Sequence, residues 1–461
     1  MPSTPEQRQK VELQRCLESF EGQFLEWRAR VELPEWGTHY SQVHAATRLL
    51  EGLRDGLKTT LDSGKDSAGK SADLSLLEPL VLSAWRVWEA FRSRLSQRQE
   101  EMFRAGLQAA DELAWCVRKP FADLLGSALP KEPALCYLNG AVSPTALVRG
   151  VPFAEEAVRG EGVHVEARKL LESLPVPLIS LPWTEVFHAP SMVSIAHETG
   201  HVLEVDAKLE GALPGVVAKA ANDSNWKPWA KEIFADHIAM RACGRGFAVF
   251  LADLLAPLKK RGVRPMPAYP DYDTRMELCF AALADMGHAQ QAGELRQEWK
   301  NMSGTVKSSP LADAVVKALA KMKVSGQNLS DVITFNSDHE SAVLRIMRDL
   351  RQNPARVSEQ PATHIAAAAA CLFHEEPEYF DDLARTQDIQ QVMLRAAGPS
   401  SRRRAGRRVD LRLRSMPAAK NAAVADAAFE AHFQQGANLL LDLLKQRRRA
   451  SSKPKPSASK S

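Results

Sequence analysis

The feature that most constrains this chain is the pentapeptide HETGH at residues 197–201, which lies within an apolar run of residues 191–206. Residues four apart lie one turn from each other on the same face of an α-helix, so a helix here lets His197 and His201 reach one metal ion. Glu198 follows the first histidine directly, which places its carboxylate beside the metal, where it can take a proton from metal-bound water. The pattern therefore predicts a helix that carries two zinc ligands and a general base.

A catalytic zinc takes three protein ligands and keeps one position open for water, so a third ligand must be found elsewhere. The extended pattern HExxHxxGxxH is excluded, because Glu204 and Ala207 stand where it requires glycine and histidine. Two histidines at helical spacing also occur as a core or surface pair. The third ligand decides between these two interpretations.

A second predicted helix, residues 226–240, carries two carboxylates on one face. Glu232 and Asp236 are four residues apart within an otherwise apolar run. Carboxylates on a buried helix face need partners. A metal ion would be the partner of Glu232, and the ring N–H of a ligand histidine would be that of Asp236. The alternative is an ion pair on the helix surface with Lys231 or Arg241.

Together, the two motifs resemble the signature of the gluzincin zinc metallopeptidases, in which HExxH on one helix is followed by a Glu and, four residues later, an Asp on a second helix. The Glu-x-x-Ala-Asp form is similar to that of several bacterial peptidase families. The resemblance covers about residues 176–246. It implies that His197, His201 and Glu232 bind zinc (Zn2+), that Glu198 is the base and proton shuttle, and that Asp236 orients the first histidine.

The resemblance also implies a residue that stabilises the tetrahedral oxyanion, a Tyr, His or Arg from a downstream segment. Tyr269, Tyr272, Arg275 and His288 are the nearby candidates. We assign Tyr272 and Arg275 to the catalytic group, although no spacing singles them out. The alternatives are a loop aromatic residue and a charge on a helix surface.

The chain as a whole has the pattern of a mainly α protein. The resemblance implies that it contains a zincin-like α+β metallopeptidase core, including a small sheet, flanked by helical regions. Its 461 residues suffice for several domains. Residues 134–138 and 177–181 are the best strand candidates, since Pro and Gly bound them. The edge of such a sheet can hydrogen-bond an extended peptide. The predicted regions are an N-terminal helical region at 1–128, the core at 129–300, a C-terminal helical region at 301–398 and a basic tail with one amphipathic helix at 399–461.

The tail differs from the rest of the chain in its charge. It holds fifteen Lys and Arg against four Asp and Glu, a local charge of +11, so the preceding residues carry −7 of the total of +4. Such segments bind nucleic acid or other polyanions through phosphate charge, without reading the sequence. A purely solubilising tail is the alternative.

Other patterns in the sequence indicate where the protein resides and which further sites it is expected to lack. No apolar run approaches the ~20 residues of a membrane span, so no span is predicted. The N-terminus lacks a basic start followed by an apolar stretch, so we expect a cytoplasmic protein. The six cysteines are scattered and form no CxxC pair, which favours reduced core residues. Residues 64–71, GKDSAGKS, fit the phosphate-loop pattern, but no apolar strand precedes them, which favours a plain Gly/Ser loop.

The expected function is zinc-dependent hydrolysis of peptide bonds in a peptide or protein, as an endopeptidase rather than an exopeptidase. Zinc lowers the pKa of bound water toward ~7, Glu198 removes a proton, and the resulting hydroxide attacks the carbonyl. The alternative is a non-catalytic zinc-binding helical scaffold that contacts nucleic acid through its basic tail. A closed structural zinc site prefers four ligands, usually with cysteine, and the nearby Cys243 has no partner cysteine in sequence.

Overall fold

The computed structural model of the chain describes residues 4–31, 39–63, 74–126, 132–140, 143–147, 177–304, 306–307 and 309–396. The candidate phosphate loop at 64–71 and the basic tail at 399–461 lie outside these residues. The described residues form two compact units, one up to Leu95 and one from Ser96 onward. The boundary predicted at residue 128 falls inside the second unit, and the boundary predicted at residue 300 falls inside a helix of that unit.

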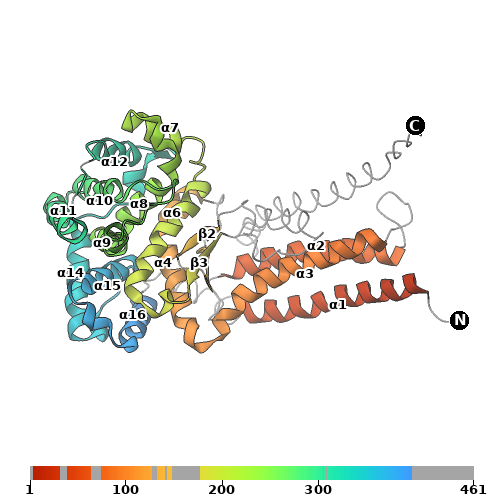
Figure 1. The fold of residues 1–461 in the computed structure, drawn as a ribbon. Coiled ribbons are helices and arrows are strands. Elements are labelled where there is room, and N and C mark those ends of the chain that lie inside the picture. Colours follow the sequence, from red (N-terminus) through yellow and green to blue (C-terminus); the bar gives the residue numbers. More distant parts are fainter. Residues whose placement is uncertain are drawn as a thin grey trace, which may run out of the picture. The chain divides into compact units, whose positions relative to one another are not determined.

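The first unit contains the long helices α1 (Pro5–Val31), α2 (Tyr40–Ser63) and α3 (Leu74–Ser96) (Figure 1). Its core is built on an apolar stripe of α1, in which residues recur every three or four positions and so share one face. The buried members of the stripe are Leu13, Leu17, Phe20, Phe24 and Trp27. Phe20 stacks on Trp85 of α3, with ring centroids 4.5 Å apart. The aromatic residues of α1 are therefore core residues.

The second unit is mainly helical, and so is the protein, as predicted. Its longer helices, labelled in Figure 1, are α4 (Glu101–Leu125), α6 (Ser194–Asp206), α7 (Leu213–Ala221), α8 (Ala230–Cys243), α9 (Arg245–Lys260), α10 (Tyr272–Asp285), α11 (Ala289–Ser303), α12 (Ala312–Ala320), α14 (Ser337–Gln352), α15 (Ala362–Glu375) and α16 (Leu383–Ala396). The short helix α13 (Leu329–Val332) follows a two-stranded hairpin of β4 (Lys323–Val324) and β5 (Gln327–Asn328). One hydrophobic core extends from Leu107 in α4 to Met393 in α16.

A three-stranded sheet lies in the same unit, with β3 (Leu178–Pro182) in its centre. β1 (Leu135–Asn139) pairs with β3 in parallel, with Leu135 opposite Leu178. β2 (Thr145–Leu147) pairs with the other side of β3 in antiparallel orientation. The strands predicted at 134–138 and 177–181 are thus present one residue later, and they pair with each other. The short strand β2 was not predicted.

Helix α8 lies in the middle of this unit. Each residue from Ile233 to Cys243 is buried, including the polar Asp236, His237 and Arg241, so the helix is covered by other elements on all sides. Polar groups at its centre, such as Asp236, must find partners inside the protein. None of the described helices is long and apolar enough to cross a membrane.

Candidate metal centre

The motif HETGH lies on α6, as the sequence predicted. The chain enters this helix through a 3-10 turn (Ala189–Val193) that contains Pro190 near its start. The hydroxyl of Thr199 donates to the Ile195 carbonyl oxygen at 2.7 Å, so this polar side chain is satisfied within the helix. The motif residues are therefore held on a regular and almost fully buried helix.

The second motif lies on α8, after a 3-10 turn (Ser224–Trp229). Asp223 caps the start of this turn, because its side chain accepts from the Asn225 backbone N–H at 2.9 Å. The helix ends at Cys243, before Gly244 with a φ of +53°, a conformation that favours glycine. Local capping and turn chemistry thus sets the register of Glu232 and Asp236.

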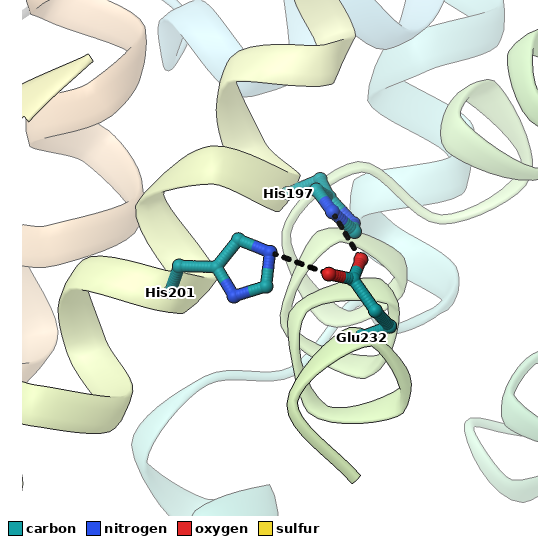
Figure 2. A group of neighbouring side chains, drawn as sticks. All are labelled: His197, His201 and Glu232. Atoms are coloured by element: carbon teal, nitrogen blue, oxygen red, sulfur yellow. Dashed lines mark ion pairs between the residues drawn. The ribbon is translucent and has the colours of Figure 1, made fainter. Parts of the chain in front are cut away.

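Helices α6 and α8 bring His197, His201 and Glu232 together (Figure 2). His197 Nε2 lies 3.3 Å from Glu232 Oε2, and His201 Nε2 lies 3.6 Å from Glu232 Oε1. Ligands around a tetrahedral zinc at ~2.1 Å lie about 3.4 Å from one another. The two separations between the histidines and the Glu232 carboxylate are therefore close to that value, and all three ligand atoms lie within 4.8 Å of one another. In the described part of the chain this is the one such group of three or more residues.

Asp236 supports the first histidine. His197 Nδ1 lies 2.8 Å from Asp236 Oδ1, which fixes the tautomer that donates from Nδ1 and directs Nε2 toward Glu232. Asp236 is itself held by Arg275, whose Nε and Nη2 donate to Oδ2 and Oδ1 at 2.6 and 2.8 Å. Burial would raise the pKa of Asp236, but the Arg275 guanidinium outweighs burial and lowers it. Asp236 is therefore an ionised acceptor.

The charges at the centre favour a cation. Burial would raise the pKa of Glu232, but hydrogen bonds to the two histidines hold it below its usual range, so the carboxylate is ionised. Burial would likewise lower the pKa of His197, yet its hydrogen bonds to Asp236 and Glu232 raise it to about 10. The carboxylates thus favour a positive charge at Nε2, supplied by a proton or, in its place, by a metal ion. One carboxylate and two imidazoles with converging ring nitrogens form a donor set that fits zinc.

Glu198 is buried, with 7% of its surface exposed, and its charge acts on several groups around the centre. It contributes to the raised pKa of His197, of Tyr269 and of Glu185. Glu185, which the sequence did not single out, accepts a hydrogen bond from the Ser194 hydroxyl at 2.9 Å, and burial above all raises its pKa to about 8. The charge of Glu198 therefore acts both on a metal ligand, His197, and on the buried Glu185.

The downstream residues do not all lie where the sequence placed them. Tyr272 is the first residue of α10 and packs into the hydrophobic core. The Arg275 guanidinium donates to the carboxylate of Asp236. The Nε2 atom of His288 lies within hydrogen-bond distance of the Phe335 carbonyl oxygen, at 3.1 Å. Tyr269 is the candidate near the centre, because burial and the charges of Glu232 and Glu198 raise its pKa to about 12. One sequence signal could have favoured Tyr269 over Tyr272. Asp271 caps the start of α10, so Tyr269 lies in the loop before the helix and Tyr272 lies within it.

Gly200 allows the two motif helices to approach each other. A Cβ atom at this position would lie 2.7 Å from the Cα atom of Ala235, a distance that real Cβ contacts essentially never show. Both motifs therefore need a small residue at their fourth position, which is Gly200 in the first and Ala235 in the second. The spacing of the metal ligands depends on this contact.

We expect Gly200→Ala to destabilise the protein by about 1–3 kcal/mol through overpacking, against a helix-propensity gain of about 1 kcal/mol. The control is Gly293→Ala in α11, where an added Cβ meets nothing within 4 Å, so only the gain applies. Urea unfolding of both variants measures the difference. Equal stabilisation of the two would contradict the close packing of α6 on α8.

Searches against protein families, curated proteins and solved structures found no match to this chain. The function is therefore inferred from the residues and the geometry of the candidate metal centre alone.

Proposed function

We propose that this protein is a zinc-dependent peptidase with a zincin-like core. The observation that carries the proposal is the convergence of His197, His201 and Glu232, with ligand atoms within 4.8 Å of one another, beside the buried Glu198. These three residues would hold the ion, which supplies an acidified water and a Lewis acid for the carbonyl group. The remaining steps belong to side chains of this chain.

Glu198 moves the proton. As a carboxylate it accepts a proton from the attacking water while the water oxygen bonds to the peptide carbonyl carbon. As the carbon–nitrogen bond breaks, Glu198 gives the same proton to the leaving amine. The side chain thus ends the cycle as the carboxylate with which it began.

Tyr269 takes the role of hydrogen-bond donor to the carbonyl oxygen, which we had expected of Tyr272 and Arg275. A tyrosine phenol is protonated at neutral pH, as a donor requires, and burial raises the pKa of Tyr269 further, to about 12. Arg275 makes two hydrogen bonds to Asp236, and Tyr272 is buried in the core.

The sheet beside α6 supports a peptide as the substrate. β2 packs near α6 (Figure 1), and among the described residues it pairs on one side only, with β3. An extended peptide can add to such an edge through backbone hydrogen bonds. Because an edge strand binds the middle of a chain as readily as its end, this favours an endopeptidase.

The alternative is a non-catalytic scaffold with a closed structural zinc site. Such a site prefers four ligands, usually including cysteine. Cys243 is buried, and burial raises the pKa of its thiol, which disfavours the thiolate that binds zinc. Three donors within the described residues fit a site with one open position better. Nucleic acid or another polyanion remains the proposed partner of the basic tail.

The test is the zinc content of the purified protein together with hydrolysis of a mixed fluorogenic peptide library. We expect about one zinc per chain by mass spectrometry, loss of hydrolysis on removal of the metal by a chelator, and its recovery when zinc is added back. A protein that takes up no zinc when zinc is supplied would overturn the proposal. Bound zinc without hydrolysis of any peptide would favour the scaffold.

A further inference from the structure

Arg275 is linked to the metal centre in an unusual way, because it contacts the residue that orients a ligand and not a ligand itself. Its guanidinium donates through Nε and Nη2 to both oxygens of Asp236, in the planar two-point geometry that only arginine provides. Asp236 Oδ1 is shared with His197 Nδ1. Each oxygen of Asp236 is therefore bonded to α10, and one of them also bonds to the ligand on α6.

The pair is buried, so its presence needs a reason other than stability. Asp236 has 3% of its surface exposed and Arg275 has 9%. Removing two charges from water costs several kcal/mol per ion, and replacing buried pairs with apolar residues is often neutral or stabilising. The pair fixes the orientation of the Asp236 carboxylate, because a carboxylate held at both oxygens cannot rotate away from His197.

The same guanidinium also contacts Tyr269. The Arg275 Cζ atom lies 5.3 Å from the centroid of the Tyr269 ring, within the ~6 Å of a cation–π contact. The loop that carries Tyr269 is also attached to the start of α8, where Trp229 Nε1 donates to the Pro267 carbonyl oxygen at 3.2 Å. Arg275 thus contacts both Asp236, which orients His197, and Tyr269, the proposed hydrogen-bond donor to the substrate carbonyl oxygen.

We propose that Arg275 is a positioning residue that fixes His197 through Asp236 and Tyr269 through its guanidinium face. The inference rests on the proposed function, since it assigns a role within the same centre. Without the Arg275 guanidinium, the two hydrogen bonds that hold both oxygens of Asp236 are lost, so the carboxylate is free to rotate. A rotated carboxylate no longer holds the Nδ1–H of His197 as it does in the intact protein.

The chain contains a matched control on the same helix. Glu277 of α10 accepts from Arg296 of α11 through Nε and Nη2, at 3.1 and 3.0 Å, and the Arg296 Cζ atom lies 5.2 Å from the Phe280 ring centroid. This arginine has the same two kinds of contact as Arg275. Neither Arg296 nor Glu277 belongs to the group of metal ligands.

The experiment compares zinc affinity in the full-length wild type and in the Arg275→Met, Arg275→Lys and Arg296→Met variants, by competition with a chromogenic chelator. Circular dichroism and unfolding confirm that each variant is folded. We expect a 10–100-fold loss of affinity in Arg275→Met, the range seen when a partner of a metal ligand is removed. Arg275→Lys keeps the positive charge but replaces the two-point guanidinium contact with a single ammonium group. It should therefore lose less zinc affinity than Arg275→Met. Arg296→Met should bind zinc as the wild type does.

A second readout is the visible absorption spectrum of the Co²⁺-substituted protein, which reports the ligand geometry without any substrate. We expect Arg275→Met to change this spectrum and Arg296→Met to leave it unchanged. Wild-type zinc affinity and an unchanged cobalt spectrum in folded Arg275→Met would overturn the inference and leave the peptidase proposal standing. A wild type that binds no zinc would instead remove the proposed function itself.

Discussion

Replacement of Glu198 by Gln is expected to lower kcat for peptide hydrolysis by about 10²–10⁴-fold, the usual contribution of a general acid–base residue, while the zinc stays bound. The amide has nearly the shape of the carboxylate but cannot accept the proton of the attacking water. It also makes no contact that holds the metal, because the candidate ligand atoms belong to His197, His201 and Glu232. Steady-state kinetics on a fluorogenic peptide and metal content by mass spectrometry measure the two effects on one sample.

The control for this variant is Glu210→Gln, which removes a carboxylate from an exposed position after α6. It should leave both activity and zinc content unchanged. Should Glu198→Gln keep more than a tenth of the wild-type activity, Glu198 would not be the base. Should it lose the metal as well, the carboxylate would be part of the binding site and the proton would have to pass through another group.

The elements that the sequence predicted correctly are those whose signals are local. The helix over HETGH, the helix that carries Glu232 and the paired strands β1 and β3 each show their own periodicity and bounding residues. β2 has three residues and depends on pairing with β3, so no local pattern marks it. The division into units was not visible either, because an apolar stripe on α4 shows that a helix packs without showing what it packs against.

The same distinction applies within the candidate site. His197, His201, Glu232 and Asp236 come together because each pair is fixed by helical spacing on a single helix, and one contact between α6 and α8 then joins the pairs. Arg275 and Tyr269 come from a segment about forty residues further on, whose position depends on tertiary packing. The sequence therefore identified Arg275 as a residue of the site, but with a role at the carbonyl oxygen instead of at Asp236.

Replacement of Glu232 by Ala is expected to weaken zinc binding by more than the ~10–100-fold that loss of a residue bonded to a ligand costs. The change removes one of three donor atoms and the only carboxylate among them. It also removes the acceptor that lies 3.3 Å from His197 Nε2 and 3.6 Å from His201 Nε2, so both imidazoles lose the group toward which they converge. Competition with a chelator gives the affinity, and mass spectrometry of the purified variant gives the residual content.

The relative zinc affinities of two variants distinguish a residue that binds the metal from one that only orients a ligand. If Glu232 binds the ion, Glu232→Ala must lose more affinity than Asp236→Asn, which removes the charge of a residue bonded only to His197 and Arg275 among these groups. Glu210→Ala, an exposed carboxylate, should change neither value. If Glu232→Ala kept its zinc at wild-type affinity, the third ligand would have to be another residue. The contact of α8 with α6 would then be structural, because the separations of 3.3 and 3.6 Å would describe an ion pair between helices and not a coordination sphere.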